Sequence, residues 1–285
     1  MNYQKIIIIG APRSGTNMLR DILTSFDGVA TWPCDEINYI WRYGNRGFRS
    51  DKLPVEKATL KIQKYIRKKF DKVAIDYQSD FVVEKTCANS LRVPFIDKIL
   101  PDAKFIYICR DGIDATGSAK ERWTAGLDVP YLMAKIRYVP PLDLPYYAVR
   151  YLWARLCRLF SNEKRLAFWG PALENMPVIL KKYTLIETCA LQWQQCVDSA
   201  DSAFSSMSSE KVIRLSYEDF VMRPTEELSK ILCFLGKEVK LSEIDKAVKN
   251  VSTKSLGKGR ASLCKDNVRM LEQLVGDTLK RHGYL

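Results

Sequence analysis

The chain of 285 residues is long enough for one substantial α/β domain or two small ones. Its content of 47% hydrophobic and 27% charged residues is typical of globular proteins and excludes disordered, collagen-like and coiled-coil chains. The formal net charge of +12 favours an anionic ligand, which could be a nucleic acid, a nucleotide or a negatively charged membrane surface. The single histidine, His282, argues against a Ser-His-Asp or Cys-His triad and against a histidine-rich metal site.

The cysteines and the apolar segments bear on the compartment. None of the eight cysteines forms a CxxC pair, so we interpret them as reduced packing residues and expect a cytoplasmic protein. The apolar run at 6–9 is too short for a signal peptide. No apolar stretch approaches the ~20 residues of a membrane span. The sequence thus predicts no transmembrane segment and leaves peripheral membrane contact open.

The hydrophobic pattern alternates between strands and helices. Strands are predicted at 5–9, 80–84, 104–109 and 211–215, and the first is a continuous β-branched run typical of a buried parallel strand. Helices are predicted at 18–26, 91–100, 114–123, 186–204, 226–236 and 268–282, with Gly28 ending the first. This order predicts an α/β fold, a P-loop-like parallel sheet flanked by helices, in one domain over 1–285.

One segment interrupts the alternation. The stretch from Pro130 to Pro177 is rich in proline, and within it 146–169 is rich in aromatic residues and arginine. We interpret it as a helical insertion on the sheet, spanning roughly 124–185. It directly follows the helix at 114–123, so we expect it to cover one side of a ligand crevice. A structural cap with solvated arginines is the alternative.

The loop after the first strand has the spacing of a phosphate-binding loop. Gly10-Ala-Pro-Arg-Ser-Gly15 places two glycines five residues apart between a strand and a helix, where backbone N–H groups can hold a phosphate. Nucleotide triphosphatases follow the second glycine with a lysine for the terminal phosphates and a hydroxyl for magnesium. Here Thr16 and Asn17 stand there, and Arg13 supplies a planar donor group instead. The loop is therefore predicted to bind phosphate or sulfate oxygens without a metal.

A second anion site is predicted at the end of the strand at 104–109. Arg110 follows that strand at the edge where open α/β sheets bind ligands. Ser118 and Arg122 are four residues apart on the next helix and share one face. Together the three could hold a second phosphate, although a helix cap and a solvated arginine are the simpler interpretation.

Charged residues near two other predicted elements also belong at this edge. Lys85 follows the strand at 80–84 and could neutralise a leaving phosphate. Asp35 and Glu36 precede a short apolar helical stretch, where Asp35 suits an N-cap and Glu36 would be left to face the crevice.

Taken together, these motifs resemble the sulfotransferases that use 3′-phosphoadenosine 5′-phosphosulfate (PAPS). Gly10-Ala-Pro-Arg-Ser-Gly-Thr-Asn17 is similar to their 5′-phosphosulfate loop, and Phe105-Ile-Tyr-Ile-Cys-Arg-Asp-Gly112 with Ser118 is similar to their 3′-phosphate motif. The stretches from Lys211 to Gly236 and from Ser255 to Tyr284 resemble later parts of the family in the same order. The pattern is nearest to the branch with the Arg-Ser-Gly-Thr loop, which includes bacterial and tyrosylprotein sulfotransferases.

The resemblance implies the chemistry and the site residues. A sulfuryl group would pass in line from PAPS to an acceptor hydroxyl, or to an amine, leaving 3′,5′-ADP (PAP), with no metal. Glu36 would be the base, and Lys85 and Arg13 would stabilise the leaving phosphate. The donor would be bound by Arg13, Ser14, Gly15, Thr16, Asn17, Arg110, Ser118, Arg122, Tyr217, Lys258 and Arg260, with Ser252 as a weaker candidate. A glycan, a glycolipid, a peptide or a small metabolite could be the acceptor. The predicted insertion would cover the acceptor side of the crevice, with Arg150, Arg155 and Arg158 available to an acidic acceptor.

The chain departs from the cytosolic branch of that family, which usually has a loop lysine and a histidine base. Two other functions fit part of the pattern. A magnesium-dependent P-loop kinase or NTPase would have the same loop spacing. Thr16 and Asn17 argue against it, because they stand where such an enzyme has a lysine and a metal-binding hydroxyl. A non-catalytic module that binds nucleic acid or anionic membranes would fit the net charge of +12. If the protein uses PAPS, we expect it to have no nucleic-acid partner.

Overall fold

The computed structural model describes residues 3–123, 137–149, 152–153 and 169–285. A parallel sheet runs through its centre in the order β2-β3-β1-β4-β5. The strands are β1 (Gln4–Ile9), β2 (Val29–Ala30), β3 (Phe81–Lys85), β4 (Lys104–Cys109) and β5 (Val212–Ser216). The chain passes from β3 across β1 to β4, so the topological switch point lies at the end of β1, where α/β sheets of this kind bind ligands.

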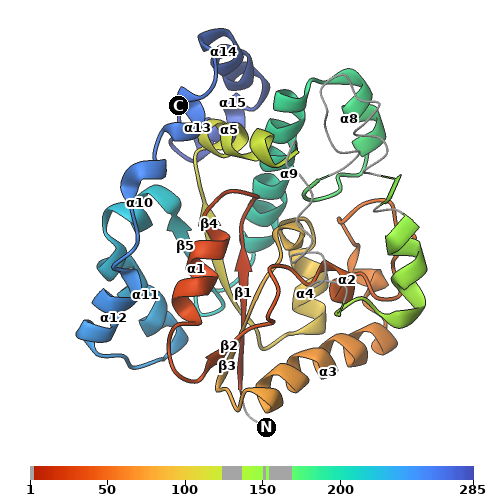
Figure 1. Cartoon of the computed structure of the whole chain (residues 1–285), viewed down its shortest axis with the longest axis vertical. Helices are drawn as coiled ribbons and strands as arrows, with labels where there is room; N and C mark the ends of the chain where they lie inside the picture. The colour runs from red at the N-terminus through yellow and green to blue at the C-terminus, as the bar shows by residue number, and fades with distance from the viewer. Residues whose placement is uncertain (1–2, 124–136, 150–151, 154–168) are drawn as a thin grey trace.

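Helices cover both faces of this sheet (Figure 1). On one face lie α1 (Thr16–Leu23), α10 (Tyr217–Met222), α11 (Pro224–Leu235) and α12 (Leu241–Val248). The other face carries α2 (Asn38–Trp41), α3 (Leu60–Asp76), α4 (Val93–Ile99), α5 (Gly112–Trp123), α8 (Met176–Lys182), α9 (Leu185–Phe204), α14 (Lys265–Leu274) and α15 (Gly276–Arg281). Short helical segments are α13 (Lys258–Ala261), η1 (Val55–Lys57), η2 (Cys87–Leu91), η3 (Pro141–Asp143) and η4 (Thr253–Ser255). No helix in the described part of the chain is long and apolar enough to span a membrane.

The central strand shows why the sheet is covered on both sides. Successive side chains of a strand point to opposite faces. Ile6 and Ile8 pack with α1 and α11, whereas Ile7 and Ile9 pack with the helices of the opposite face, and all four are fully buried. The continuous isoleucine run therefore fills two separate cores, as expected for a parallel strand in the middle of a sheet.

The predicted α/β class with a parallel sheet is confirmed, and the four predicted strands match β1, β3, β4 and β5 to within one residue. The short edge strand β2 and the helices α3, α8, α10, α12 and α13 were not predicted. The first helix was predicted too long: α1 ends at Leu23, and the hydroxyls of Thr24 and Ser25 donate back to the carbonyls of Arg20 and Ile22 at its C-terminal end. The predicted helix at 268–282 is two helices, because the backbone leaves the helical region at Val275.

The predicted insertion over 124–185 lies partly outside the described residues. Its described part contains η3, a helical stretch at 144–149, and α8, while α9 begins at Leu185. Arg155, Arg158 and Arg150 are outside the described residues, so their predicted contact with an acceptor stays a prediction.

Strand β3 carries a buried acid, Glu84, next to Lys85. Its carboxylate accepts from Thr86 Oγ1 (2.5 Å) and Asn89 Nδ2 (2.7 Å) and is 1% exposed. Burial raises the pKa of Glu84 from its usual 4.5 to about 7. The unfolded chain releases this proton near pH 4.5 and the folded chain near pH 7, so this group's contribution to stability declines as the pH rises between these values.

We expect Glu84→Gln to remove this pH dependence. At 1.36 kcal/mol per pKa unit, the free energy of unfolding of the wild type should fall by about 3 kcal/mol more than that of the variant between pH 4.5 and 7.5. Urea unfolding of both proteins across this range measures the difference. Parallel curves would show that the acid is ionised in the folded protein throughout.

Candidate active site

The carboxyl ends of β1, β3, β4 and β5 open into one pocket. The described residues that line it enclose about 1400 Å³. Pockets for one small ligand usually hold roughly 300–1,000 Å³, so this space suits two ligands side by side. Its lining includes Arg13 after β1, Lys85 at the end of β3, Arg110 after β4 and Tyr217 after β5.

The loop after β1 has the backbone shape of an anion-binding turn. Arg13 (φ 71°) and Gly15 (φ 86°) are left-handed, and Gly15 stands at the N-cap of α1 without a side-chain cap. A side chain at 15 would be strained, and its Cβ would lie 2.5 Å from the Tyr217 ring. Ser14 is wholly buried, and its hydroxyl has no hydrogen-bond partner among the described residues. Gly15, Thr16 and Asn17 at the start of α1 line the pocket. The first N–H groups of a helix have no partner within the helix, so this end of α1 fits a bound phosphate or sulfate.

Lys85 is the buried cation at the centre of the site. Its Nζ lies 3.0 Å from Asp35 Oδ1 and 3.1 Å from Glu36 Oε1, and its side chain is 1% exposed. Burial lowers its pKa, but Glu36, Cys87 and Asp35 outweigh burial and hold it above the usual value, so the ammonium stays charged. Glu36 Oε1 also accepts from the backbone N–H of Cys87 (3.2 Å).

The predicted N-cap role of Asp35 is wrong. Helix α2 begins at Asn38 with Ile37 as its N-cap residue and no side-chain cap. Asp35 instead binds Arg20 Nη1 at 2.9 Å as well as Lys85, because two cations hold its carboxylate away from the helix end. Glu36 lines the pocket as predicted, but it is paired with Lys85.

Arg110 ties three chain segments together. It is paired with Asp114, donates to the backbone carbonyl of Arg13 (3.0 Å) and donates to that of Ser255 (2.6 Å). Its guanidinium also lies 4.4 Å from the centre of the Tyr217 ring. Of the five N–H donors of an arginine, these contacts leave one for a ligand. Arg110 is thus both a structural tie and a lining residue.

Three arginines crowd the same end of the pocket. Arg13 Nε donates to Ser118 Oγ at 2.8 Å, which joins the loop after β1 to α5. Burial, followed by repulsion from Arg122 and Arg110, lowers the pKa of Arg13. An anion bound among these three side chains would relieve that repulsion, which supports the predicted grouping of Arg110, Ser118 and Arg122.

The C-terminal segment reaches the pocket with one of its two predicted basic residues. Lys258 lines the pocket, whereas the guanidinium of Arg260 pairs with Glu272 (2.8 Å) and Asp111 (3.4 Å) and is not among the described lining residues. The backbone N–H of Arg260 bonds to Asp114 instead (3.1 Å). Ser252, the weaker candidate, caps η4 through the N–H of Lys254 and does not belong to the described lining.

Tyr217, which was predicted to bind the donor, is largely covered by other residues. It is 6% exposed, lies against Gly15 and Arg110, and shares a hydrogen bond with the hydroxyl of Ser255. It therefore forms a wall between the two predicted phosphate sites. The predicted role of Tyr217 in binding the donor stays a prediction.

A second set of lining residues is largely aromatic. Tyr39 and Tyr147 meet edge to face with ring centres 4.5 Å apart. Among the described residues, this set comprises Tyr39, Arg42, Phe48, Arg49, Tyr146, Tyr147, Trp153, Trp169, Met176 and Leu180. The pocket thus has a cationic half at the strand ends and an aromatic half beside the predicted insertion.

Sequence reasoning missed several residues of the site. Arg20, Asp114 and Asp51 were not singled out, although each forms an ion pair at the pocket. Asp114 lies four residues after Arg110, a helical spacing that could have identified the pair. No local signal links Asp51 to its partners, which come from distant segments. Among the described residues, no group of three or more His, Cys, Asp or Glu is placed to hold a metal ion.

Comparisons with known proteins bear on the family and the fold of this chain. A profile described as "Sulfotransferase family" matches residues 5–168. The fold is similar to the sulfotransferase domain from the curacin biosynthetic pathway, with 13% identity, a TM-score of 0.55, and 96% of this chain and 98% of that chain covered. It is also similar to mouse sulfotransferase SULT7A1, crystallised with PAP, with 15% identity, a TM-score of 0.52, and coverage of 97% and 85%.

A third similar structure is the sulfotransferase domain from the olefin synthase of Synechococcus PCC 7002, with 14% identity, a TM-score of 0.51, and coverage of 95% and 94%. Curated protein sequences gave no significant match. At these identities the structures show the fold alone, and the family follows from the profile, which spans more than half of the chain. The chain belongs to the sulfotransferase family.

Proposed function

We propose that the protein transfers a sulfuryl group from PAPS to an acceptor hydroxyl, with Glu36 as the base. The observation that carries this proposal is the placement of Lys85 and Glu36 beside the N-terminus of α1, in a pocket with a cationic half and an aromatic half. The PAP bound in the structure of SULT7A1 supports the choice of donor. Location in the cytoplasm remains part of this proposal.

In the proposed reaction the acceptor oxygen forms a bond to sulfur while the bond between sulfur and the 5′-phosphate oxygen breaks. Glu36 takes the acceptor proton. The open N–H groups of α1, with Arg13 and Lys85, stabilise the charge that develops on the leaving phosphate. The products are the sulfated acceptor and PAP.

The pairing of Lys85 with Glu36 suggests how the two roles are coupled. The ionised Glu36 holds Lys85 at 3.1 Å before the reaction. When Glu36 takes the proton it loses its charge, and its attraction for Lys85 declines at the moment when negative charge grows on the leaving phosphate. Lys85 then has a stronger partner in the phosphate than in Glu36.

The donor assignment is tested by calorimetric titration of PAP with magnesium and with EDTA. We expect equal affinity in both, because the loop offers Arg13, Thr16 and Asn17 in place of the triphosphatase lysine and metal hydroxyl. ATP with magnesium is the comparison ligand. Loss of PAP binding on chelation, or stronger binding of ATP with magnesium, would favour a kinase or NTPase instead.

The 3′-phosphate assignment is tested at Ser118. Ser118→Ala removes the partner of Arg13 Nε and one hydroxyl near Arg110 and Arg122, so PAP should lose about tenfold in affinity while 5′-AMP loses little. Arg110→Ala should show the same selectivity together with lower stability, because it leaves Asp114 without its charged partner. If both variants keep the wild-type ratio of the two affinities, the 3′-phosphate binds elsewhere.

The acceptor is sought with labelled PAPS and one representative of each class. Suitable probes are 2-naphthol, a tyrosine peptide, a glycolipid and an amino sugar. The aromatic half of the pocket suits a ring, which can belong to a phenol or to a sugar.

A further inference from the structure

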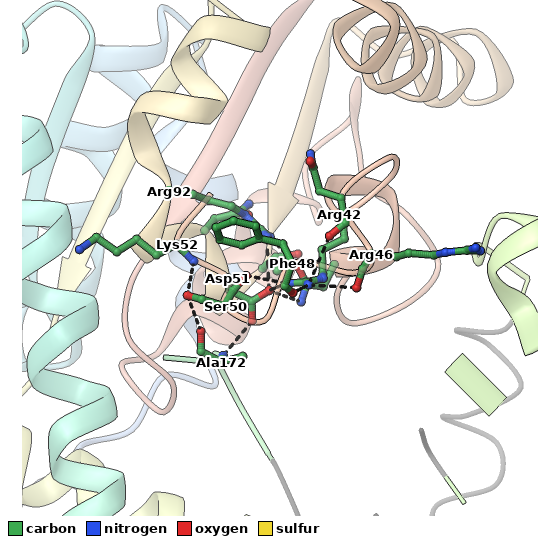
Figure 2. A network of polar contacts seen from close by, with 12 residues as sticks. Arg42, Arg46, Phe48, Ser50, Asp51, Lys52, Arg92 and Ala172 are labelled. Atoms are coloured by element: carbon green, nitrogen blue, oxygen red, sulfur yellow. Dashed lines mark hydrogen bonds and ion pairs between the residues drawn. The ribbon is translucent and has the colours of Figure 1, made fainter. Parts of the chain in front are cut away.

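A loop on the acceptor side is folded around one buried arginine (Figure 2). Arg42 is 5% exposed and donates to Asp51 Oδ1 (2.7 Å) and to the carbonyl of Ser50 (2.9 Å). It also reaches the carbonyls of Phe48, Arg46 and Asn45. These contacts fix the backbone from 45 to 51, which includes pocket-lining residues 47–49 and 51.

Asp51 connects this loop to a segment more than a hundred residues away. Its Oδ2 accepts from the backbone N–H of Ala172 (2.8 Å), and its own N–H donates to the carbonyl of Ala172 (2.7 Å). The hydroxyl of Ser50 donates to the same carbonyl (3.1 Å). Figure 2 shows Ser50 and Asp51 facing Ala172 across these bonds. Three hydrogen bonds therefore hold one residue of the distant segment.

Ala172 belongs to the wall of the aromatic half. Trp169, Gly170, Pro171 and Ala172 all line the pocket, and Met176 follows at the start of α8. On the other side of this wall, Gln192 of α9 donates to the carbonyls of Trp169 (2.8 Å) and Pro171 (2.9 Å). The wall is thus held between α9 and Asp51.

The same network extends back to the strand that carries Lys85. Arg92 lies 3.5 Å from Asp51 Oδ1 and donates to Asn89 Oδ1, and Asn89 in turn donates to Glu84 (2.7 Å). Glu84 immediately precedes Lys85 in β3. Continuous polar contacts therefore join the cationic half of the pocket to the wall of the aromatic half.

Stability alone gives a weak reason for such a network. Burying two arginines with one aspartate is costly, and apolar residues of similar volume often serve stability as well or better. A directional network does supply fixed geometry, because each hydrogen bond sets a distance and an angle.

We propose that Asp51 is a positioning residue, which sets the place of the Trp169–Ala172 wall relative to Lys85 and so aligns the acceptor for transfer. The proposal rests on the sulfotransferase function proposed above. Asp51 acts through Ala172 and Arg42. The proposed role concerns the aromatic half of the pocket, where the acceptor would bind, and donor binding is expected to stay unchanged.

The test compares Asp51→Asn and Ser50→Ala with the wild type by three measurements. Asp51→Asn keeps the shape but removes the charge shared by Arg42 and Arg92, and Ser50→Ala removes one bond to Ala172 and leaves the ion pairs in place.

With PAP bound, hydrogen exchange of the amides at 169–176 should accelerate at least tenfold in Asp51→Asn and less in Ser50→Ala. The KM for 2-naphthol should rise roughly tenfold to a hundredfold in Asp51→Asn, since displacements of about 1 Å can cost 10²-fold. The Kd for PAP should change less than twofold.

The control is Tyr107→Phe, which removes a buried hydroxyl bonded to Asp201 (3.0 Å) away from the described pocket lining. It should lower stability without changing the exchange at 169–176 or the KM. If Asp51→Asn does not fold, Ser50→Ala alone decides. Unchanged exchange at 169–176 in the folded variants, or a weakening of PAP equal to the rise in KM, overturns the positioning role. A wild type that binds no PAP overturns the proposed function instead, and the exchange experiment then still decides whether Asp51 holds the wall.

Discussion

Glu36→Gln is expected to reduce turnover by roughly 10²- to 10⁴-fold while leaving the affinity for PAP nearly unchanged. The amide keeps an oxygen that can accept from the N–H of Cys87, so the local backbone should stay in place. It cannot take a proton from the acceptor. Single-turnover transfer from labelled PAPS measures the rate, and calorimetry with PAP measures the affinity.

Asp35→Asn is the matched control, because Asp35 and Glu36 both pair with Lys85 at nearly the same distance. Each variant removes one negatively charged partner of Lys85, but only Glu36→Gln removes the proposed base. A large loss confined to Glu36→Gln supports the assignment. An inactive Asp35→Asn beside an active Glu36→Gln would make Asp35 the base, and equal losses would show that the charge around Lys85 matters more than a proton acceptor.

The parts of the fold that could be predicted from the sequence are those with a strong local pattern. The isoleucine run of β1 and the glycine loop after it predicted a parallel sheet with a ligand site at its carboxyl edge; the parallel sheet is found, and a pocket opens at that edge. Helix α3 was missed because its apolar residues, Ile62, Ile66, Phe70 and Val73, are separated by lysines and adjoin no motif. Strand β2 has only two residues and owes its existence to pairing with β3.

The candidate site divides along the same line. Arg13, Lys85, Arg110 and Ser118 each follow a strand or share a helix face, so their meeting could be foreseen from topology. Other contacts of the site could not be foreseen, because they depend on tertiary structure. Arg260 pairs with Glu272 and not with the pocket, and Asp35 is held by Arg20. The link between Asp51 and Ala172 spans 121 residues and leaves no periodic trace.

The second large effect is expected where α5 and α13 touch through their backbones. A Cβ on Gly117 would lie 2.2 Å from the carbonyl oxygen of Gly259, and a Cβ on Gly259 would lie 1.9 Å from that of Asp114. This close approach lets Asp114 accept from the N–H groups of Gly259 (2.5 Å) and Arg260 (3.1 Å). Only glycines allow the C-terminal segment to close against α5 in this way.

Gly117→Ala should therefore weaken PAP binding by more than tenfold without removing any polar group. The methyl group meets backbone, which cannot rotate away, so α13 must move and take Lys258 with it. Such overpacking also costs about 1–3 kcal/mol of stability. Gly276→Ala is the control, because its Cβ would meet only Leu285 at 3.9 Å, and it should keep both affinity and stability. Titration with PAP and thermal unfolding measure the two quantities. A Gly117→Ala protein that is destabilised but binds PAP like the wild type would show that the closure of α13 against α5 is structural and that the nucleotide does not depend on Lys258.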